Sequence, residues 1–247
     1  MKTLANLPHN LRKQRTLLKE GLYELLWPAR CCVCDMPETY LCERCERDLP
    51  YVDLWQACPT CGAPFGQLVC TECNSFILKE RGVERIPFDG CVSVAQFNGA
   101  ARRLITVYKD SHEGELAPEI ARLLAQCIMP AWLDESVLTY IPASKNALRR
   151  RGFDHMERVA QELSKRTGLT CMQLFAPWNS RDQRGLDAKA RMANMRKVLR
   201  VMEGVEVPER VIVLDDVLTT GATMFAATDA LKAAGAKKVY ALTLLRV

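Results

Sequence analysis

The chain has 247 residues, 49% of them apolar, and its 34 Lys and Arg exceed its 29 Asp and Glu, which gives a formal net charge of +5. This composition favours a globular chain with room for one core and a small appendage. The longest apolar runs fall far short of the ~20 residues of a membrane helix, and residues 1–30 lack the continuous apolar core of a signal peptide. We therefore expect no membrane insertion and a cytoplasmic location. Twelve cysteines in a reducing compartment favour metal binding over a disulfide framework.

The first predicted element is an N-terminal helix within residues 1–30. In residues 11–27 apolar side chains recur at roughly helical spacing with charges between them, and Pro28 ends the pattern. These apolar residues are Leu11, Leu18, Leu22, Leu25 and Leu26. A helix docked on its own protein explains the pattern better than a membrane or partner helix.

Four Cys-x-x-Cys pairs follow. Two residues between paired thiolates let both reach one tetrahedral ion, and two such pairs facing each other close a site. The eight cysteines therefore predict two structural zinc sites in a double zinc-ribbon-like domain at residues 31–80, because an all-thiolate site leaves no position for water or substrate. Sequential pairing needs the shortest loops, but the same spacings allow an interleaved pairing, and Cys32 could replace Cys31. The predicted ligands are Cys31, Cys34, Cys42, Cys45, Cys58, Cys61, Cys70 and Cys73.

After a polar joint at residues 79–87, strands alternate with helices, so we predict an α/β domain over 88–247. Right-handed crossovers place such strands in parallel and gather ligands at their carboxyl edge, where the loops after Ile141 and Leu214 emerge. The predicted strands are 91–97, 137–141, 170–175, 211–214 and 238–245, and the predicted helices are 100–109, 115–128, 153–167, 187–199 and 224–234.

The stretch Val211–Thr223 has the features of a phosphate site. A buried strand is followed by two acids, Asp215 and Asp216, and then by small residues that open a helix. Backbone N–H groups at the helix start, with threonine hydroxyls beside them, can bind a phosphate, while the two carboxylates can accept hydrogen bonds from sugar hydroxyls. Together these groups indicate a ribose 5-phosphate. The loop residues are Val217, Leu218, Thr219, Thr220, Gly221, Ala222 and Thr223.

Basic residues concentrate in 145–200, where fourteen Lys or Arg face five Asp or Glu, a local excess of +9. Guanidinium groups offer bidentate donors that suit the two phosphates of pyrophosphate. The predicted pyrophosphate-binding residues are Ser144, Lys145, Arg149, Arg150 and Arg151. The polar segment from Arg181 onward, with Gln183 and Arg191, suits a flexible loop that closes over substrate, although an ordinary basic helix explains it nearly as well.

Residues 211–223 resemble the loop of type I phosphoribosyltransferases that binds phosphoribosyl pyrophosphate (PRPP). The chain as a whole resembles the ComF/GntX family through its Leu-Leu-Trp-Pro-x-Arg-Cys approach at 25–31, its cysteine pairs, Arg-Arg-Gly-Phe at 150–153, and the Gln183-x-x-Leu186 and Arg191-x-x-Asn194 pairs. It departs from that family at Asp154, where Asn is usual, at Tyr108, where Leu is usual, and at Val198-Leu199, where Ala-Phe is usual.

This resemblance implies a type I phosphoribosyltransferase fold, a mainly parallel sheet flanked by helices, that binds PRPP with Mg²⁺ bridging pyrophosphate and ribose hydroxyls. Asp215 and Asp216 would be the catalytic acids and hold the ribose, and the basic loops would neutralise the leaving group. The implied activity is phosphoribosyl transfer to an unknown acceptor. The alternative is a non-catalytic scaffold that senses PRPP or binds single-stranded DNA or a competence protein during DNA uptake. Because residues 31–80 are not basic, any DNA contact would use the 145–200 region.

Overall fold

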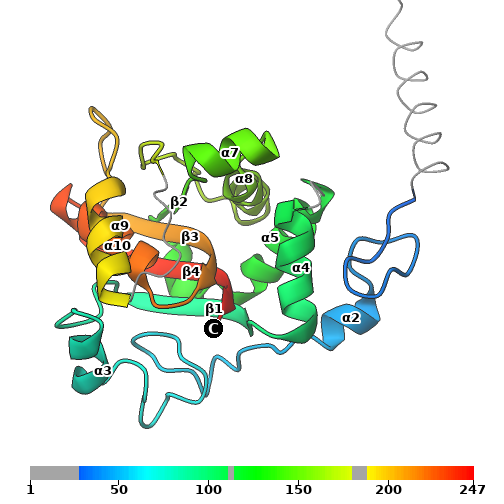
Figure 1. Ribbon diagram of the computed structural model, residues 1–247, viewed down its shortest axis with the longest axis horizontal. Coiled ribbons are helices and arrows are strands. Elements are labelled where there is room, and N and C mark those ends of the chain that lie inside the picture. The colour runs from blue at the N-terminus through cyan, green and yellow to red at the C-terminus, as the bar shows by residue number, and fades with distance from the viewer. Residues whose placement is uncertain (1–27, 111–113, 180–187) are drawn as a thin grey trace, which may run out of the picture. The chain divides into compact units, whose positions relative to one another are not determined.

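The computed structural model describes residues 28–110, 114–179 and 188–247, and it divides into two units, residues 1–47 and 48–247 (Figure 1). The described part of the first unit holds the first two Cys-x-x-Cys pairs, Cys32, and a short helix, α2 (Glu43–Arg47). The second unit holds the other cysteine pairs and every strand of the described residues. The helix predicted at residues 11–27 lies outside the described residues, and the domain limits 31–80 and 88–247 stay a prediction.

Four parallel strands form the sheet of the second unit, in the order β1 (Gly90–Gln96), β4 (Lys238–Arg246), β3 (Arg210–Leu218) and β2 (Val137–Tyr140). The two interior strands are buried along most of their length, as expected for a parallel sheet that is covered on both faces. This arrangement confirms the predicted α/β class and its parallel sheet.

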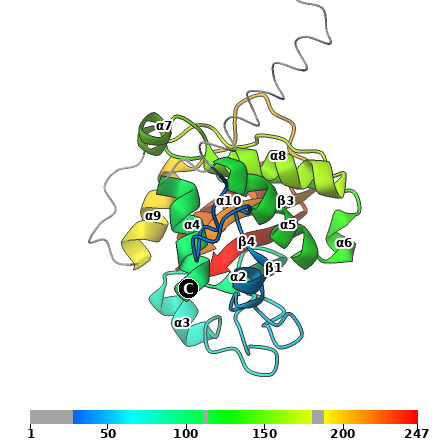
Figure 2. The ribbon, with the colours of Figure 1, turned by 90° about the vertical axis from the view of Figure 1, so that its right-hand side faces the viewer.

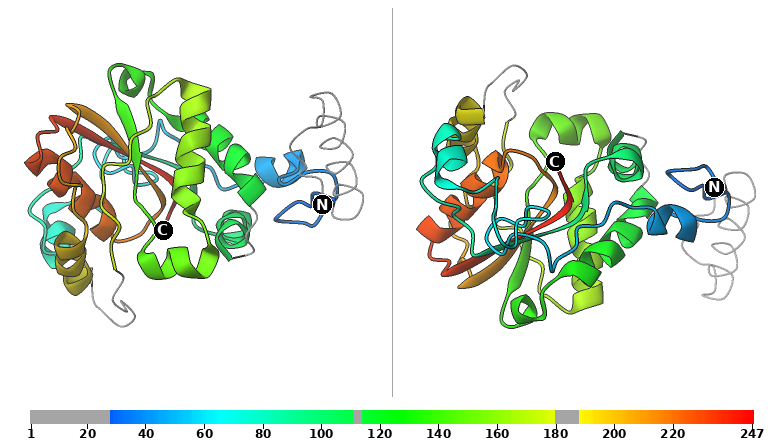
Figure 3. Two further views of the ribbon diagram at one scale, coloured as in Figure 1. Left: turned by 90° about the horizontal axis from the view of Figure 1, so that it is seen from above. Right: turned by 90° about the horizontal axis from the view of Figure 1, so that it is seen from below.

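Helices cover both faces of the sheet. On one face α5 (Ala117–Cys127) packs against α8 (His155–Thr167), with α4 (Gly99–Asp110) beside them; on the other, α9 (Ala188–Val198) packs against α10 (Ala222–Ala233) (Figures 1 and 2). The views from above and below show the same two groups of helices (Figure 3). The remaining short helices are α3 (Ser75–Glu80), the 3₁₀ turn Gly114–Leu116, α6 (Pro130–Leu133) and α7 (Lys145–Arg151).

A hydrophobic core lies between the sheet and the pair α9 and α10. Val211 and Val213 of β3 contribute to it, and the ring of Phe225 in α10 packs 5.6 Å from the ring of Phe88. Val83, just after α3, belongs to the same core. This packing holds the start of α10 against the end of β3, which is where the predicted phosphate loop lies.

Two of the differences between observed and predicted elements lie near the sheet edge that carries the site. Residues expected to form only a loop after Ile141 include the helix α7, which is capped by the Ser144 side chain accepting a hydrogen bond from the Ala147 N–H. The strand expected at 170–175 makes only isolated bridges, from Cys171 to β2 and from Phe175 to Val201, because its two ends pair with different partners. None of the helices in 28–110, 114–179 and 188–247 is both long and apolar enough to cross a bilayer.

Candidate functional site

The end of β3 and the loop after it form a hollow of about 100 Å³. The strand continues four residues beyond the predicted Leu214, so Asp215 and Asp216 belong to the strand itself. The hollow is lined by Asp215, Val217, Leu218, Thr219, Thr220, Gly221, Ala222, Thr223 and Met224, with Met195 of α9. All seven predicted loop residues and one of the two acids therefore face the same space.

Gly221 sets the angle between this loop and α10. It is the N-cap of the helix and has φ of +81°, in the left-handed region that only glycine adopts without strain. A Cβ here would also lie 2.8 Å from the ring of Phe225, a core residue that cannot easily move. Both constraints require glycine, and the turn they produce directs the start of a 12-residue helix toward the hollow, where its N–H groups favour an anion.

The two acids face opposite sides of the sheet, as consecutive residues of a strand must. Asp215 lies toward the hollow and accepts a hydrogen bond of 2.8 Å from the Asp216 N–H. Burial, and after it the negative charge of Asp216, raise the pKa of Asp215 to about 8. Asp215 therefore holds a proton near neutral pH and can release it when a cation or a set of hydroxyl donors arrives.

Asp216 lies on the face covered by α4 and α8. Its Oδ2 forms an ion pair with Lys109 at the end of α4 and lies 2.7 Å from Nε2 of His155 at the start of α8. Burial acts to raise the pKa of Asp216, but the charge of Lys109 and the contact with His155 outweigh it and hold this pKa well below its usual value. Asp216 is thus a permanent anion with two partners.

The contacts of His155 define which of its nitrogens carries the hydrogen. Its Nδ1 lies 3.1 Å from Nη1 of Arg151, and because a guanidinium only donates, Nδ1 is the acceptor. Nε2 then carries the hydrogen and donates it to Asp216. The buried Tyr108 hydroxyl donates to the His155 backbone carbonyl at 2.6 Å and fixes the start of α8. A continuous chain of hydrogen bonds therefore runs from Arg151 in α7 to Asp216 in β3.

Asp154 explains one departure from the ComF/GntX pattern. It is the N-cap of α8, where its Oδ1 accepts from the N–H groups of Met156 and Glu157 at 3.0 and 3.3 Å. Its Oδ2 accepts from the Ala143 N–H at 2.6 Å. The amide of Asn has only one oxygen, so it would leave one of these donors without its partner. The carboxylate ties the loop before α7 to the helix that carries His155.

The other predicted basic residues lie apart from the hollow. Lys145, Arg149 and Arg150 are exposed on α7, while Arg151 is partly buried against His155. Gln183 lies outside the described residues, and Arg191 falls within α9. The structure thus links Arg151 to Asp216 through His155 and leaves Lys145, Arg149 and Arg150 facing solvent.

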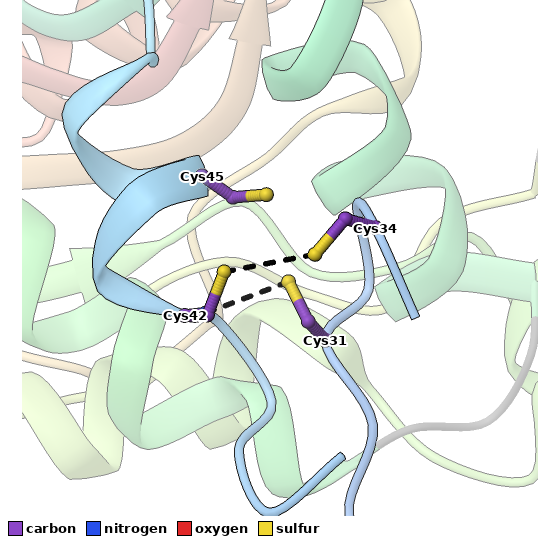
Figure 4. Close-up of side chains that lie close together, drawn as sticks. All are labelled: Cys31, Cys34, Cys42 and Cys45. Atoms are coloured by element: carbon purple, nitrogen blue, oxygen red, sulfur yellow. Dashed lines mark hydrogen bonds between the residues drawn. The ribbon is translucent and has the colours of Figure 1, made fainter. Parts of the chain in front are cut away.

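Two groups of four cysteines are present, and in each group all sulfur atoms lie within 4.8 Å of one another. The first group is Cys31, Cys34, Cys42 and Cys45 (Figure 4). In it the sulfurs of Cys34 and Cys42 are 3.6 Å apart. The second group is Cys58, Cys61, Cys70 and Cys73, with sulfur separations of 3.7 Å between Cys58 and Cys73 and 3.6 Å between Cys61 and Cys70.

Tetrahedral zinc accounts for these separations. Four sulfurs, each about 2.3 Å from one ion, lie about 3.8 Å from each other. Backbone N–H groups also point at the sulfurs, that of Cys42 at Cys31 and that of Glu72 at Cys70, both at 3.4 Å. The two groups could therefore hold structural zinc. The grouping is the sequential one, so the interleaved pairing is wrong, and Cys31 rather than Cys32 belongs to the first group.

Lys109 and His155 are site residues that the sequence did not reveal. Lys109 lies in the last turn of α4 and His155 in the first turn of α8, and neither position distinguishes it from other residues at helix ends. The only available signal was the rarity of histidine, since the chain has three. Their role depends on α4 and α8 converging on β3, which no local pattern contains.

Comparison with known proteins agrees with this architecture. Residues 114–247, more than half of the chain, match the family model described as phosphoribosyl transferase domain. Competence protein ComFC of Streptococcus pneumoniae is 24% identical over 85% of this chain and 89% of its own length.

Solved structures also align. A hypoxanthine-guanine phosphoribosyltransferase from Bacillus anthracis is 17% identical, with a TM-score of 0.33, over 54% of this chain and 68% of its own. An orotate phosphoribosyltransferase from Aeropyrum pernix is 19% identical, with a TM-score of 0.33, over 70% and 80%. On the family match, together with the ComFC match that confirms the ComF/GntX resemblance, the chain belongs to the phosphoribosyl transferase family.

Proposed function

We propose that the protein binds PRPP with Mg²⁺ in the hollow after β3 and transfers the phosphoribosyl group to an acceptor. The observation that carries the proposal is the position of Asp215, which faces the same hollow as Thr219, Thr220 and Thr223 at the start of α10. Hydrogen-bond donors for a phosphate and a carboxylate that can bind sugar hydroxyls thus line the same hollow, which is what binding of a ribose 5-phosphate requires.

In this proposal different residues bind different parts of PRPP. Backbone N–H groups and hydroxyls of the 219–223 loop donate to the 5′-phosphate, and Asp215 accepts from the ribose hydroxyls once it has lost its proton. Mg²⁺ prefers carboxylate, hydroxyl and phosphate oxygens, so Asp215 is the protein group that suits it, and the metal would neutralise charge on the pyrophosphate. Arg151 is the predicted pyrophosphate ligand that hydrogen bonds link to the end of β3, through His155 and Asp216.

Transfer requires positive charge to develop at C1 of the ribose as pyrophosphate leaves, so the task of the protein is positioning and charge stabilisation. Asp216 lies on the opposite face of the sheet and is already paired with Lys109 and His155, so Asp215 is the carboxylate that faces the ribose. The basic side chains Lys145, Arg149 and Arg150 are exposed on α7 and outside the hollow, so their part in pyrophosphate release would require α7 or the ligand to move.

The test is calorimetric titration of the zinc-loaded protein with PRPP, with and without Mg²⁺, and with ribose 5-phosphate and pyrophosphate as separate ligands. Micromolar binding of PRPP that depends on Mg²⁺ is expected. Asp215→Asn should weaken it by at least about tenfold, because a charged acceptor is lost. Asp229→Asn, an acid of α10 that pairs with Arg196 at 2.9 Å, is the matched control and should bind normally. Equal affinity in both variants would reject the assignment.

A catalytic role then needs an acceptor. Release of pyrophosphate from PRPP on addition of a nucleobase or another nitrogen compound would establish an enzyme. Tight PRPP binding with no release for any acceptor would favour a sensor.

The second candidate function is binding of single-stranded DNA, in the cytoplasm and with competence proteins as partners. It is supported by the name of the relative, competence protein ComFC, and by the exposed Lys145, Arg149 and Arg150 of α7. Such binding should weaken steeply between 50 and 200 mM salt, by roughly 10³-fold if about six phosphates are contacted. Fluorescence anisotropy of a labelled oligonucleotide measures it, and an affinity independent of salt would exclude this use of α7.

A further inference from the structure

The second cysteine group packs directly on the sheet of its own unit. Gly62, which directly follows Cys61, has φ of +71°, and a Cβ on it would lie 2.6 Å from the carbonyl oxygen of Cys91 in β1. Ile86 packs against both this cysteine group and the core between the sheet and α10. The group is therefore part of the packing of the second unit and not an appendage attached by a linker.

Arg246, the last residue of β4, connects this group to the sheet. Its side chain is only 4% exposed. Its Nη1 donates to the Cys61 carbonyl at 2.6 Å, and its Nη2 donates to Glu72 at 2.7 Å and lies 3.8 Å from the Cys61 sulfur. A zinc ion bound by four thiolates carries a net negative charge, and a buried guanidinium beside one of its sulfurs compensates that charge.

The backbone of the same residue supports the phosphate loop. Arg246 is the register partner of Leu218, and the next N–H, that of Val247, donates to the Leu218 carbonyl at 3.0 Å. Leu218, Thr219 and Gly221 line the candidate phosphate hollow on one side. On the other side the same three residues line a smaller space together with Cys61, Glu72 and Arg246. A single layer of loop therefore separates the candidate ligand from the cysteine group.

We propose that the metal-loaded second cysteine group is the rear support of the phosphate loop, and that Arg246 is the positioning residue that transmits this support. A bound metal fixes Cys61, which fixes the guanidinium of Arg246, and β4 then holds Leu218 and the turn to Gly221. Loss of the metal or of the guanidinium frees the loop to open locally. The effect on ligand affinity rests on the proposed function, but the effect on the loop does not.

The test compares Arg246→Met with Arg210→Met in the full-length protein. Arg210 is the matched control because it lies at the opposite end of β3, where its Nη2 donates to the Ala131 carbonyl at 2.7 Å. Zinc content and hydrogen exchange of residues 218–223 are measured without ligand. We expect Arg246→Met to keep two zinc ions and to exchange about tenfold faster in this segment, since hydrogen bonds of a charged group are lost. Arg210→Met should leave this segment unchanged. Unchanged exchange in Arg246→Met, or equal changes in both variants, would overturn the proposal.

A second comparison removes one metal site at a time by substituting two of its cysteines. The double substitution of Cys58 and Cys61 to Ser should raise exchange in residues 218–223, whereas the same change at Cys31 and Cys34, in the other unit, should not. If the Cys58 and Cys61 variant fails to fold, the comparison of Arg246→Met with Arg210→Met still tests the proposal. A final titration with PRPP should show about tenfold weaker binding in Arg246→Met. If the wild type does not bind PRPP, the proposed function fails, while the exchange measurement still tests the support of the loop.

Discussion

Replacing Lys109 by Met removes the cation that pairs with Asp216. The two side chains are only 24% and 14% exposed, so the pair is screened little by water. Removing one partner of a buried ion pair costs about 3–5 kcal/mol, because the other charge is left uncompensated. The hydrogen bond from His155 to Asp216 remains, and we therefore expect a loss of about 2–3 kcal/mol in the free energy of unfolding. For a chain of this size that corresponds to a fall of about 4–12 °C in Tm.

The loss should depend on pH, with a sign that follows from Asp216. Its pKa is lowered in the folded protein, so its contribution to stability is present above the pKa of about 3.9 that it has in the unfolded chain, and is lost as pH falls through the folded value. Without Lys109 the pKa of Asp216 rises toward its usual value. The difference between wild type and variant should be complete above about pH 5 and should shrink below about pH 4.

Urea unfolding of the zinc-loaded proteins at pH 7 measures the loss, and unfolding of both proteins without metal at pH 3 measures how far the difference shrinks, because protonated thiols do not hold zinc. Lys237→Met is the matched control, because its ion pair with Glu209 is 69% and 67% exposed and should contribute little. The double variant of Lys109→Met with Asp216→Asn completes a cycle whose coupling energy should exceed about 1 kcal/mol. A coupling near zero, or a loss no larger than that of Lys237→Met, would refute the reasoning.

Three further predictions concern protonation, polarity and metal content. Because the pKa of Asp215 is raised to about 8, its contribution to stability is present at low pH and lost as pH rises through that value, and Mg²⁺-dependent binding of PRPP near pH 7 should release up to about one proton. Calorimetry in buffers of different ionisation enthalpy detects the proton, and Asp215→Asn should abolish its release. His155→Gln should keep the stability of the wild type within about 1 kcal/mol in urea unfolding, since one amide can donate to Asp216 and accept from Arg151, whereas His155→Leu should lose about 2 kcal/mol or more; equal losses would argue against the hydrogen-bond polarity assigned here. Elemental analysis should find two zinc ions per chain and one in Cys34→Ser; no zinc in the wild type would reject both sites.

Much of the fold was predictable because the signals are local. The apolar run from Val211 to Leu214 and the acids and small residues after it lie next to each other in the sequence, and they form one strand, one turn and one helix start in space. The cysteine pairs are equally local, and their spacing limited the pairing to a few arrangements. Contacts within a short segment can be inferred from that segment alone.

The features that the sequence did not predict depend on contacts between residues that are far apart in the chain. Residues 170–175 are apolar enough for a strand, but β2 is short and residues 200–202 compete for their backbone groups, so only bridges form. The partnership of Asp216 with Lys109 and His155 joins residues from three elements. The opposite orientations of Asp215 and Asp216 also needed the strand to continue past Leu214, which hydrophobicity alone did not indicate, because carboxylates are unusual in the middle of a buried strand.

The position of β4 in the sheet has a consequence for synthesis of the protein. Of the four strands of this sheet β4 is made last, but it lies between β1 and β3, and the buried hydroxyls of Ser93 and Thr243, which are 150 residues apart, join it to the first strand at 2.7 Å. During translation β1 can pair only with residues 50–52 on one side, among the described residues, until β4 has left the ribosome, and pairings of such long range as β1 with β4 form slowly. Arg246 reaches Cys61 only at that same stage. The phosphate loop therefore acquires its support after translation of β4, and a nascent chain halted earlier would expose the edge of β1 that β4 covers, which is prone to aggregation.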